Sequence, residues 1–199
     1  MIEIKNWVAY PLRLLQRVGP LLIFFSMPTN LNRITGHRDL HFITFCCYHR
    51  QKLLETPKSR DSAVQILAEV RAKFAFALVG YVIMPEHVHL IVNETPTLLP
   101  ATVVQIFKQR VSRSLRGDQG DPLGQTAAHP TNGSAELRRF WQRRYYDFNV
   151  YTREKLKEKL EYMHANPVTE KLVAHPRDWP WSSWSFYATG KGLLKMDAI

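Results

Sequence analysis

The chain has 199 residues, of which 45% are hydrophobic and 12% aromatic, and this composition fits a folded globular protein with a single core. Its 27 Lys and Arg residues and 17 Asp and Glu residues give a net charge of +10. That charge favours a polyanion such as nucleic acid as a partner, although a basic surface can also serve solubility alone. The apolar run 21–25 is far shorter than the ~20 residues of a transmembrane helix, so we expect no membrane segment.

Residues 1–26 match none of the patterns found later in the chain, whereas Met27 opens a more ordinary stretch. A signal peptide is a second interpretation, but prolines bracket the apolar part and no small-residue cleavage site follows it. We expect 1–26 to be a non-native or disordered extension, 27–187 to be one folded domain and 188–199 to be a C-terminal tail. Detection of Met1 at the N-terminus of the natural protein would contradict the first expectation.

The first half of the domain alternates between strand and helix patterns. Residues 41–49, "HFITFCCYH", are rich in β-branched and aromatic side chains and predict a strand. Residues 59–74 carry apolar side chains at helical spacing and predict a helix. Residues 76–84 predict a second strand, which is apolar on both faces.

The second half begins with an antiparallel partner for that strand. A tight turn at Pro85 leads into a strand over 87–92. Residues 100–115 have an apolar side at helical spacing and predict a second helix. Gly, Pro, Ser and Thr dominate 117–136 and predict a long loop, after which 140–150 predict another strand.

A last helix is predicted over 152–166, capped by Thr152 and stopped by Pro167. The order is therefore β-α-β-β-α-β followed by one helix. This order predicts an α+β protein with the ferredoxin-like split arrangement, in which an antiparallel sheet carries two helices on one face. The extra helix could lie on the other face, where the fold leaves room for a site.

Cys46 and Cys47 are adjacent in the first predicted strand. Neighbouring side chains of a strand point to opposite faces, so a disulfide between them is not expected. No CxxC spacing indicates a zinc site. We interpret both residues as buried, reduced thiols of a cytoplasmic protein.

Two histidines interrupt the apolar stretch "MPEHVHLIV". Because strand side chains alternate, His87 and His89 project from one face, about 7 Å apart along the strand. Two neutral imidazoles at this spacing can share one metal cation. The alternative is that both are ordinary hydrogen-bonded or surface histidines.

The last predicted helix supplies partners for these histidines. Tyr162 and Asn166 are four residues apart and therefore share a helical face. A phenol can act as a nucleophile, but its pKa near 10 means that it needs activation or a polarised target. A cation held by two imidazoles and an amide oxygen could polarise a phosphodiester, and the product would be a covalent phosphotyrosine.

Five motifs in this order resemble the HUH single-tyrosine transposases, and most closely the REP-associated tyrosine transposases. They are "DLHFITFCCYHR", "GYVIMPEHVHLIV", "FWQRRYYDFNV", "YMHANPV" and "DWPWSSW", and they span roughly 30–187. The resemblance implies a Mg²⁺- or Mn²⁺-dependent endonuclease and strand transferase. Such an enzyme cleaves single-stranded DNA at hairpin-forming repeats, attaches to the 5′ phosphate and frees a 3′-OH.

By the same resemblance, His87 and His89 are metal ligands, Tyr162 is the nucleophile and Asn166 takes the position of the third ligand. That third position is often Gln in insertion-sequence relatives, and Asn is one carbon shorter. Glu86 is a candidate for orienting an imidazole from behind, with an exposed turn residue as the alternative. Other tyrosines compete for the nucleophile role, but only Tyr162 has a ligand-like residue at helical spacing.

Basic residues provide candidate DNA contacts, although each could equally lie on a solvated face. One group lies on the second predicted helix, a second lies in the last predicted strand beside aromatic residues, and one residue lies near the start of the domain. The candidates are Arg38, Lys108, Arg110, Arg113, Arg143 and Arg144.

A function of another class is also compatible with these residues. A protein of this fold could recognise DNA or RNA hairpins without cleaving them. Retention of His87, His89, Tyr162 and Asn166 favours the enzyme. The sequence leaves a monomer and a homodimer equally open, and the expected location is the cytoplasm, at the nucleoid.

Overall fold

The computed structural model describes residues 36, 39–116 and 139–198 of the chain. Within these residues, four strands form one antiparallel sheet in the order β2-β3-β1-β4. The strands are β1 (Leu40–Cys46), β2 (Leu78–Ile83), β3 (His87–Asn93) and β4 (Tyr146–Val150). The helices are α1 (Pro57–Phe74), α2 (Pro100–Arg116), α3 (Arg153–Thr169) and the short α4 (Trp184–Thr189). Two 3-10 turns are η3 (Tyr48–Arg50) and η5 (Pro176–Asp178).

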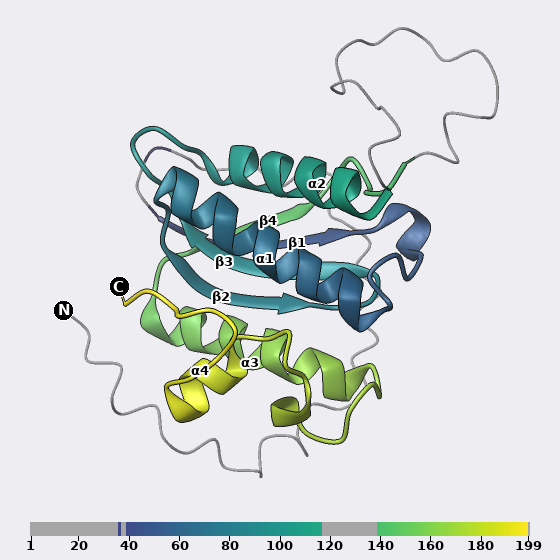
Figure 1. The fold of residues 1–199 in the computed structure, drawn as a ribbon. Coiled ribbons are helices and arrows are strands. Elements are labelled where there is room, and N and C mark those ends of the chain that lie inside the picture. Colours follow the sequence, from purple (N-terminus) through teal and green to yellow (C-terminus); the bar gives the residue numbers. More distant parts are fainter. Residues whose placement is uncertain (1–35, 37–38, 117–138, 199) are drawn as a thin grey trace, which may run out of the picture.

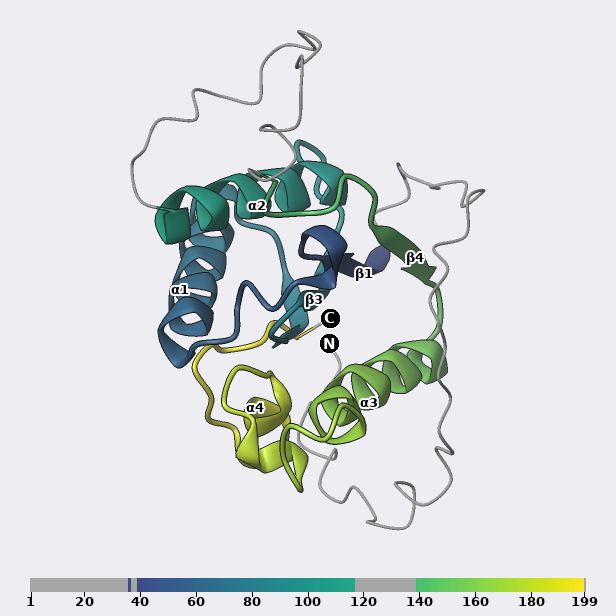
Figure 2. The same ribbon diagram turned by 90° about the vertical axis from the view of Figure 1, so that its right-hand side faces the viewer.

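These elements form three layers (Figure 1). Helices α1 and α2 cover one face of the sheet, and α3 lies on the other face; Figure 2 shows the same separation from the side. The predicted α+β, ferredoxin-like arrangement with an extra helix is therefore confirmed. No helix in the described part of the chain is both long enough and apolar enough to cross a membrane.

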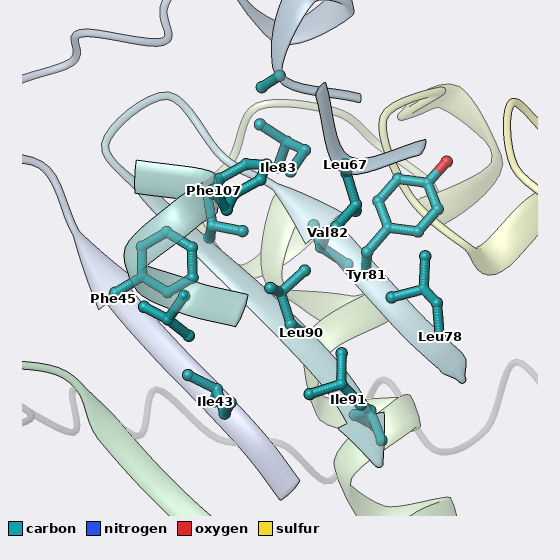
Figure 3. Close-up of a cluster of buried hydrophobic side chains, with 14 of the residues drawn as sticks. Ile43, Phe45, Leu67, Leu78, Tyr81, Val82, Ile83, Leu90, Ile91 and Phe107 are labelled. Carbon is teal, nitrogen blue, oxygen red and sulfur yellow. The ribbon is translucent and has the colours of Figure 1, made fainter. Parts of the chain in front are cut away.

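The main core fills the space between the sheet and helices α1 and α2 (Figure 3). Ile43, Phe45 and Leu90 point from the two central strands into this layer and are fully buried. They meet Leu67 of α1 and Phe107 of α2, whose ring lies 5.7 Å from that of Phe45. Because these side chains occupy alternate strand positions, the residues between them must face α3.

Helix α3 packs on the other face through a close approach at Gly80 of β2. A Cβ atom at this position would lie 2.7 Å from Leu160 Cδ2 and 3.3 Å from Met163 Sδ. Both of these α3 side chains are fully buried. The lack of a side chain at Gly80 thus sets the distance between α3 and the sheet. The helix begins at Thr152, whose side chain accepts a hydrogen bond from the Lys155 N–H.

The C-terminal segment covers the outer edge of β2. The carbonyl of Tyr81 accepts a hydrogen bond from the Ser183 N–H, and the carbonyl of Leu78 accepts one from the Asp197 N–H, both at 2.9 Å. Met196 is buried beside them. This segment satisfies backbone groups that an open edge strand would leave to solvent or to another chain.

Two predicted segments lie outside the described residues, namely the extension 1–26 and the loop 117–136. The domain boundaries therefore stay predictions. The described part of the predicted tail 188–199 packs against β2.

The prediction that the last helix stops before Pro167 is wrong, because α3 continues to Thr169. Proline has a helical φ angle and removes only one N–H donor from the helix. The last carbonyls are satisfied further along: the Lys171 N–H donates to Val168, and the Leu172 N–H donates to Pro167. The chain leaves the helix at Lys171, which has a φ of 57°.

The strand predicted over 41–49 is too long at its C-terminal end. β1 ends at Cys46, and the chain then turns, with a φ of 50° at His49 and 54° at Arg50. Strand propensity did not predict this turn because no glycine marks it.

The strand predicted over 140–150 is too long at its N-terminal end, since β4 starts at Tyr146. The residues before it pack on α2 instead. Trp141 Nε1 donates to the Lys108 carbonyl at 2.9 Å, and Lys108 Nζ donates to the Gln142 carbonyl at 3.0 Å. These tertiary contacts outweigh the local strand preference.

We predict that Gly80→Val lowers the free energy of unfolding by about 1–3 kcal/mol, because the added side chain overpacks the interface with α3. Urea denaturation of both proteins measures this difference. In a Leu160→Ala background the same substitution should cost less, because the space that it needs is then available. Equal costs in the two backgrounds would show that α3 does not press on Gly80.

Candidate active site

The two histidines of β3 converge on one point on the α3 face of the sheet. His87 Nε2 and His89 Nε2 are 3.0 Å apart, and the two rings are nearly perpendicular, at 86°. Both side chains are buried. Two ligands that share one divalent cation at adjacent coordination positions are also about 3 Å apart, given metal–ligand distances near 2.1 Å.

The other ring nitrogen of each histidine is held from behind. Glu86 Oε1 lies 2.8 Å from His87 Nδ1, and Thr44 Oγ1 lies 2.7 Å from His89 Nδ1. Arg50 Nη2 in turn donates to Glu86 Oε1 at 3.1 Å. Hydrogen bonds of this kind fix the orientation of metal-binding imidazoles and leave Nε2 free to bind.

The electrostatics of His89 suit a neutral imidazole. Burial lowers the pKa of His89 well below its ordinary value, and electrostatic repulsion from His87 and Arg50 lowers it further. Burial raises the pKa of Glu86, but the hydrogen bond to His87 and the charge of Arg50 outweigh it and leave that pKa below its usual range. A neutral imidazole whose other ring nitrogen is held by a hydrogen bond, as Thr44 holds that of His89, is the form that donates a lone pair to a metal.

Asn166 of α3 completes the candidate ligand set. Its Nδ2 lies 3.0 Å from His89 Nε2, and its Oδ1 is buried with no hydrogen-bond partner among the described residues. A half-turn of the amide exchanges these two atoms and would present the oxygen to the same point. The described residues contain no cluster of three or more His, Cys, Asp or Glu side chains suited to a metal. Two imidazoles and one amide are the donor set, and they fit a divalent cation.

Tyr162 lies one helical turn before Asn166 and faces the same place. Its ring meets His89 edge-on, with the centroids 5.6 Å apart, and Phe42 likewise at 6.0 Å. The residue is 37% exposed, so a substrate can reach it. Burial, reinforced by the Glu170 carboxylate, raises the pKa of the phenol, while Arg50 and Asn166 oppose this. Attack by this oxygen therefore needs a polarised target.

Three residues of the site were missed by the sequence analysis: Phe42, Thr44 and Arg50. Strand alternation could have found the first two, because the register pairs Thr44 with His89 and Phe42 with Ile91 on the same face. The Phe42 ring stacks on His89 at 5.5 Å. Arg50 carried no signal, because its place depends on the turn after β1.

The predicted DNA contacts separate into two groups. Lys108 and Arg110 are engaged within the protein: Lys108 Nζ reaches a backbone carbonyl, and Arg110 Nη2 pairs with Glu69 at 2.6 Å. Arg113, Arg143 and Arg144 are exposed, and Arg38 lies outside the described residues. Helix α2, which carries three of the six candidates, is on the sheet face opposite to Tyr162 (Figure 1).

The chain is similar in sequence and fold to known transposases. A protein of Haemophilus influenzae named "Putative REP-associated tyrosine transposase" is 26% identical over 164 residues, which cover 78% of this chain and 85% of the relative. A solved structure of a REP-associated tyrosine transposase bound to a REP hairpin has a similar fold. Its TM-score is 0.64 at 17% identity, and the match covers 86% of this chain and 91% of that one.

The resemblance to REP-associated tyrosine transposases inferred from the sequence motifs is thus confirmed. The family model described as "Transposase IS200 like" matches residues 37–166, a range that includes β1 through Asn166 and the whole candidate site. Because this match spans more than half of the chain, the chain belongs to the family of IS200-like transposases.

Proposed function

We propose that the protein is a metal-dependent endonuclease and strand transferase that acts on single-stranded DNA at hairpin-forming repeats. The observation that carries this proposal is the convergence of His87 Nε2, His89 Nε2 and Asn166 beside the partly exposed ring of Tyr162. A transposase of similar fold was solved with a REP hairpin, which supports this substrate class.

The chain's own residues would act as follows. Tyr162 loses its phenol proton to solvent, and its oxygen forms a bond to the phosphorus of the substrate. The bond from phosphorus to the 3′ oxygen breaks, and that oxygen leaves as a 3′-OH after taking up a proton. The product is a 5′-phosphotyrosine, which keeps a reactive phosphodiester for rejoining by the reverse reaction.

The two histidines and Asn166 would hold Mg²⁺ or Mn²⁺. Such a cation, when bound, polarises the phosphodiester and neutralises charge on its oxygens. Glu86 and Thr44 keep the imidazoles oriented, and Phe42 excludes water from one side of His89. Action on chromosomal repeats would take place in the cytoplasm, at the nucleoid.

The alternative function is recognition of DNA or RNA hairpins without cleavage. The raised pKa of Tyr162 favours it, because a phenol that is hard to ionise is a poor nucleophile. One experiment distinguishes the two functions: incubation of the protein with a pool of hairpin-bearing single-stranded oligonucleotides and Mn²⁺. A covalent DNA–protein adduct on a denaturing gel supports the transferase, whereas retarded binding without an adduct supports the alternative.

We predict that Tyr162→Phe abolishes the covalent adduct but leaves DNA binding nearly unchanged, because only the hydroxyl is removed and the ring contacts remain. Peptide mass analysis of the adduct, with gel retardation as the binding assay, measures both effects. Tyr151→Phe is the matched control, since this tyrosine is 62% exposed. An adduct that survives in Tyr162→Phe would identify another nucleophile.

We predict that His87→Ala reduces cleavage by orders of magnitude, because it removes a ligand of the cation. Removal of divalent metal with EDTA should abolish cleavage by the unaltered protein. His49→Asn is the control: His49 is exposed, and asparagine tolerates its left-handed backbone. Full cleavage in EDTA would exclude a metal mechanism.

We predict that Glu86→Ala weakens Mn²⁺ binding by about 10- to 100-fold, because the orientation of His87 is lost. Glu86→Gln should bind Mn²⁺ nearly as well as the unaltered protein, since an amide oxygen can still accept from Nδ1. Titration calorimetry with Mn²⁺ measures both affinities. Unchanged affinity in Glu86→Ala would show that the carboxylate does not orient the ligand.

A further inference from the structure

A row of aromatic side chains continues from the candidate active site to the edge of the sheet. In β4, Tyr146 and Phe148 occupy alternate positions and so share one face. Tyr146 pairs with Thr44 of β1, whose hydroxyl binds His89 on the α3 face. Both β4 aromatics are partly exposed, and β4 is an outer strand of the described sheet.

The ring contacts connect this row to the candidate nucleophile. The Tyr146 and Phe148 rings are parallel within 6°, with their centroids 6.5 Å apart. Phe42 lies 6.2 Å from Tyr146 on one side and 6.0 Å from Tyr162 on the other. Tyr146 and Phe148 together are called the aromatic shelf, and the buried Phe42 ring connects them to Tyr162.

Positive charge accompanies the shelf. Lys159 of α3, three residues before Tyr162, places its Nζ 4.9 Å from the ring centre of Phe148 and 5.4 Å from that of Phe42, and it also pairs with Glu158 at 3.5 Å. Arg143 and Arg144 are exposed just before β4. Aromatic rings beside cations are the combination that binds single-stranded nucleic acid, through stacking on bases and contacts to phosphates.

We propose that the aromatic shelf stacks on bases of single-stranded DNA next to the phosphate that Tyr162 attacks. The inference rests on the proposed function, because it assigns part of the substrate to that site. The edge position matters, since rings that served only the core would gain from full burial, whereas Tyr146 and Phe148 keep exposed surface beside basic groups.

The first test is photochemical cross-linking of the unaltered full chain, without metal, to an oligothymidine probe that contains 5-iodouracil. A cross-link in the peptide that contains Tyr146 and Phe148, located by mass analysis, is the expected result. Cross-links confined to other described surfaces, such as exposed Arg113 on α2, would overturn the proposal.

The second test is affinity for the same probe by fluorescence anisotropy. Tyr146→Leu and Phe148→Leu should each weaken binding by roughly 5- to 100-fold, the range expected for one lost base–aromatic contact. Tyr146→Phe should retain affinity, because the ring and not the hydroxyl makes the contact. Tyr151→Leu is the exposed-aromatic control, and thermal unfolding checks that each variant is folded.

The outcomes separate this inference from the proposed function. Shelf cross-links without any Tyr162 adduct on hairpin oligonucleotides would reject the transferase and keep the shelf as a DNA-binding surface. A Tyr162 adduct with unchanged affinity in both Leu variants would reject the shelf alone. If the unaltered protein neither binds the probe nor forms an adduct, both proposals are rejected.

Discussion

The closeness of α3 to the sheet is the constraint on which the candidate site depends. The histidines belong to β3, while Tyr162 and Asn166 belong to α3. These two elements are far apart in the sequence, so only packing holds them together. The missing side chain at Gly80 lets Leu160 and Met163 pack against the sheet backbone. A shift of α3 by the width of one methyl group would break the 3.0 Å contact between Asn166 and His89.

Most polar groups of the site already have hydrogen-bond partners behind the histidines. Thr44 and Glu86 occupy the rear nitrogens of the histidines, and Arg50 occupies Glu86. What remains on the inner side is the Nε2 pair and the buried Oδ1 of Asn166. An unsatisfied buried acceptor costs about 1–3 kcal/mol, and a ligand bound at this point would recover part of that free energy.

The sequence predicts the parts of this site that follow a local period. Alternation places His87 and His89 on one face, and a four-residue spacing places Tyr162 and Asn166 on another, so both pairs could be predicted. The role of Arg50 depends on a turn with positive φ angles, which no glycine marks. The continuation of α3 past Pro167 depends on hydrogen bonds made beyond the helix, and propensity does not include these.

The distribution of charge bears on the side from which DNA would approach. The sequence alone does not distinguish one basic residue from another. In the structure Arg110 pairs with Glu69 of α1, and Lys108 donates to the Gln142 carbonyl before β4, both on the α1–α2 side of the sheet. Lys159 also pairs with a carboxylate, that of Glu158 at 3.5 Å, but it lies over aromatic rings on the same sheet face as Tyr162. A DNA strand that reached Tyr162 along the α3 face would meet the cation and the rings together, whereas the whole sheet separates α2 from Tyr162. The net charge of +10 therefore favours nucleic acid in general, and the packing of individual cations selects the face that it would use.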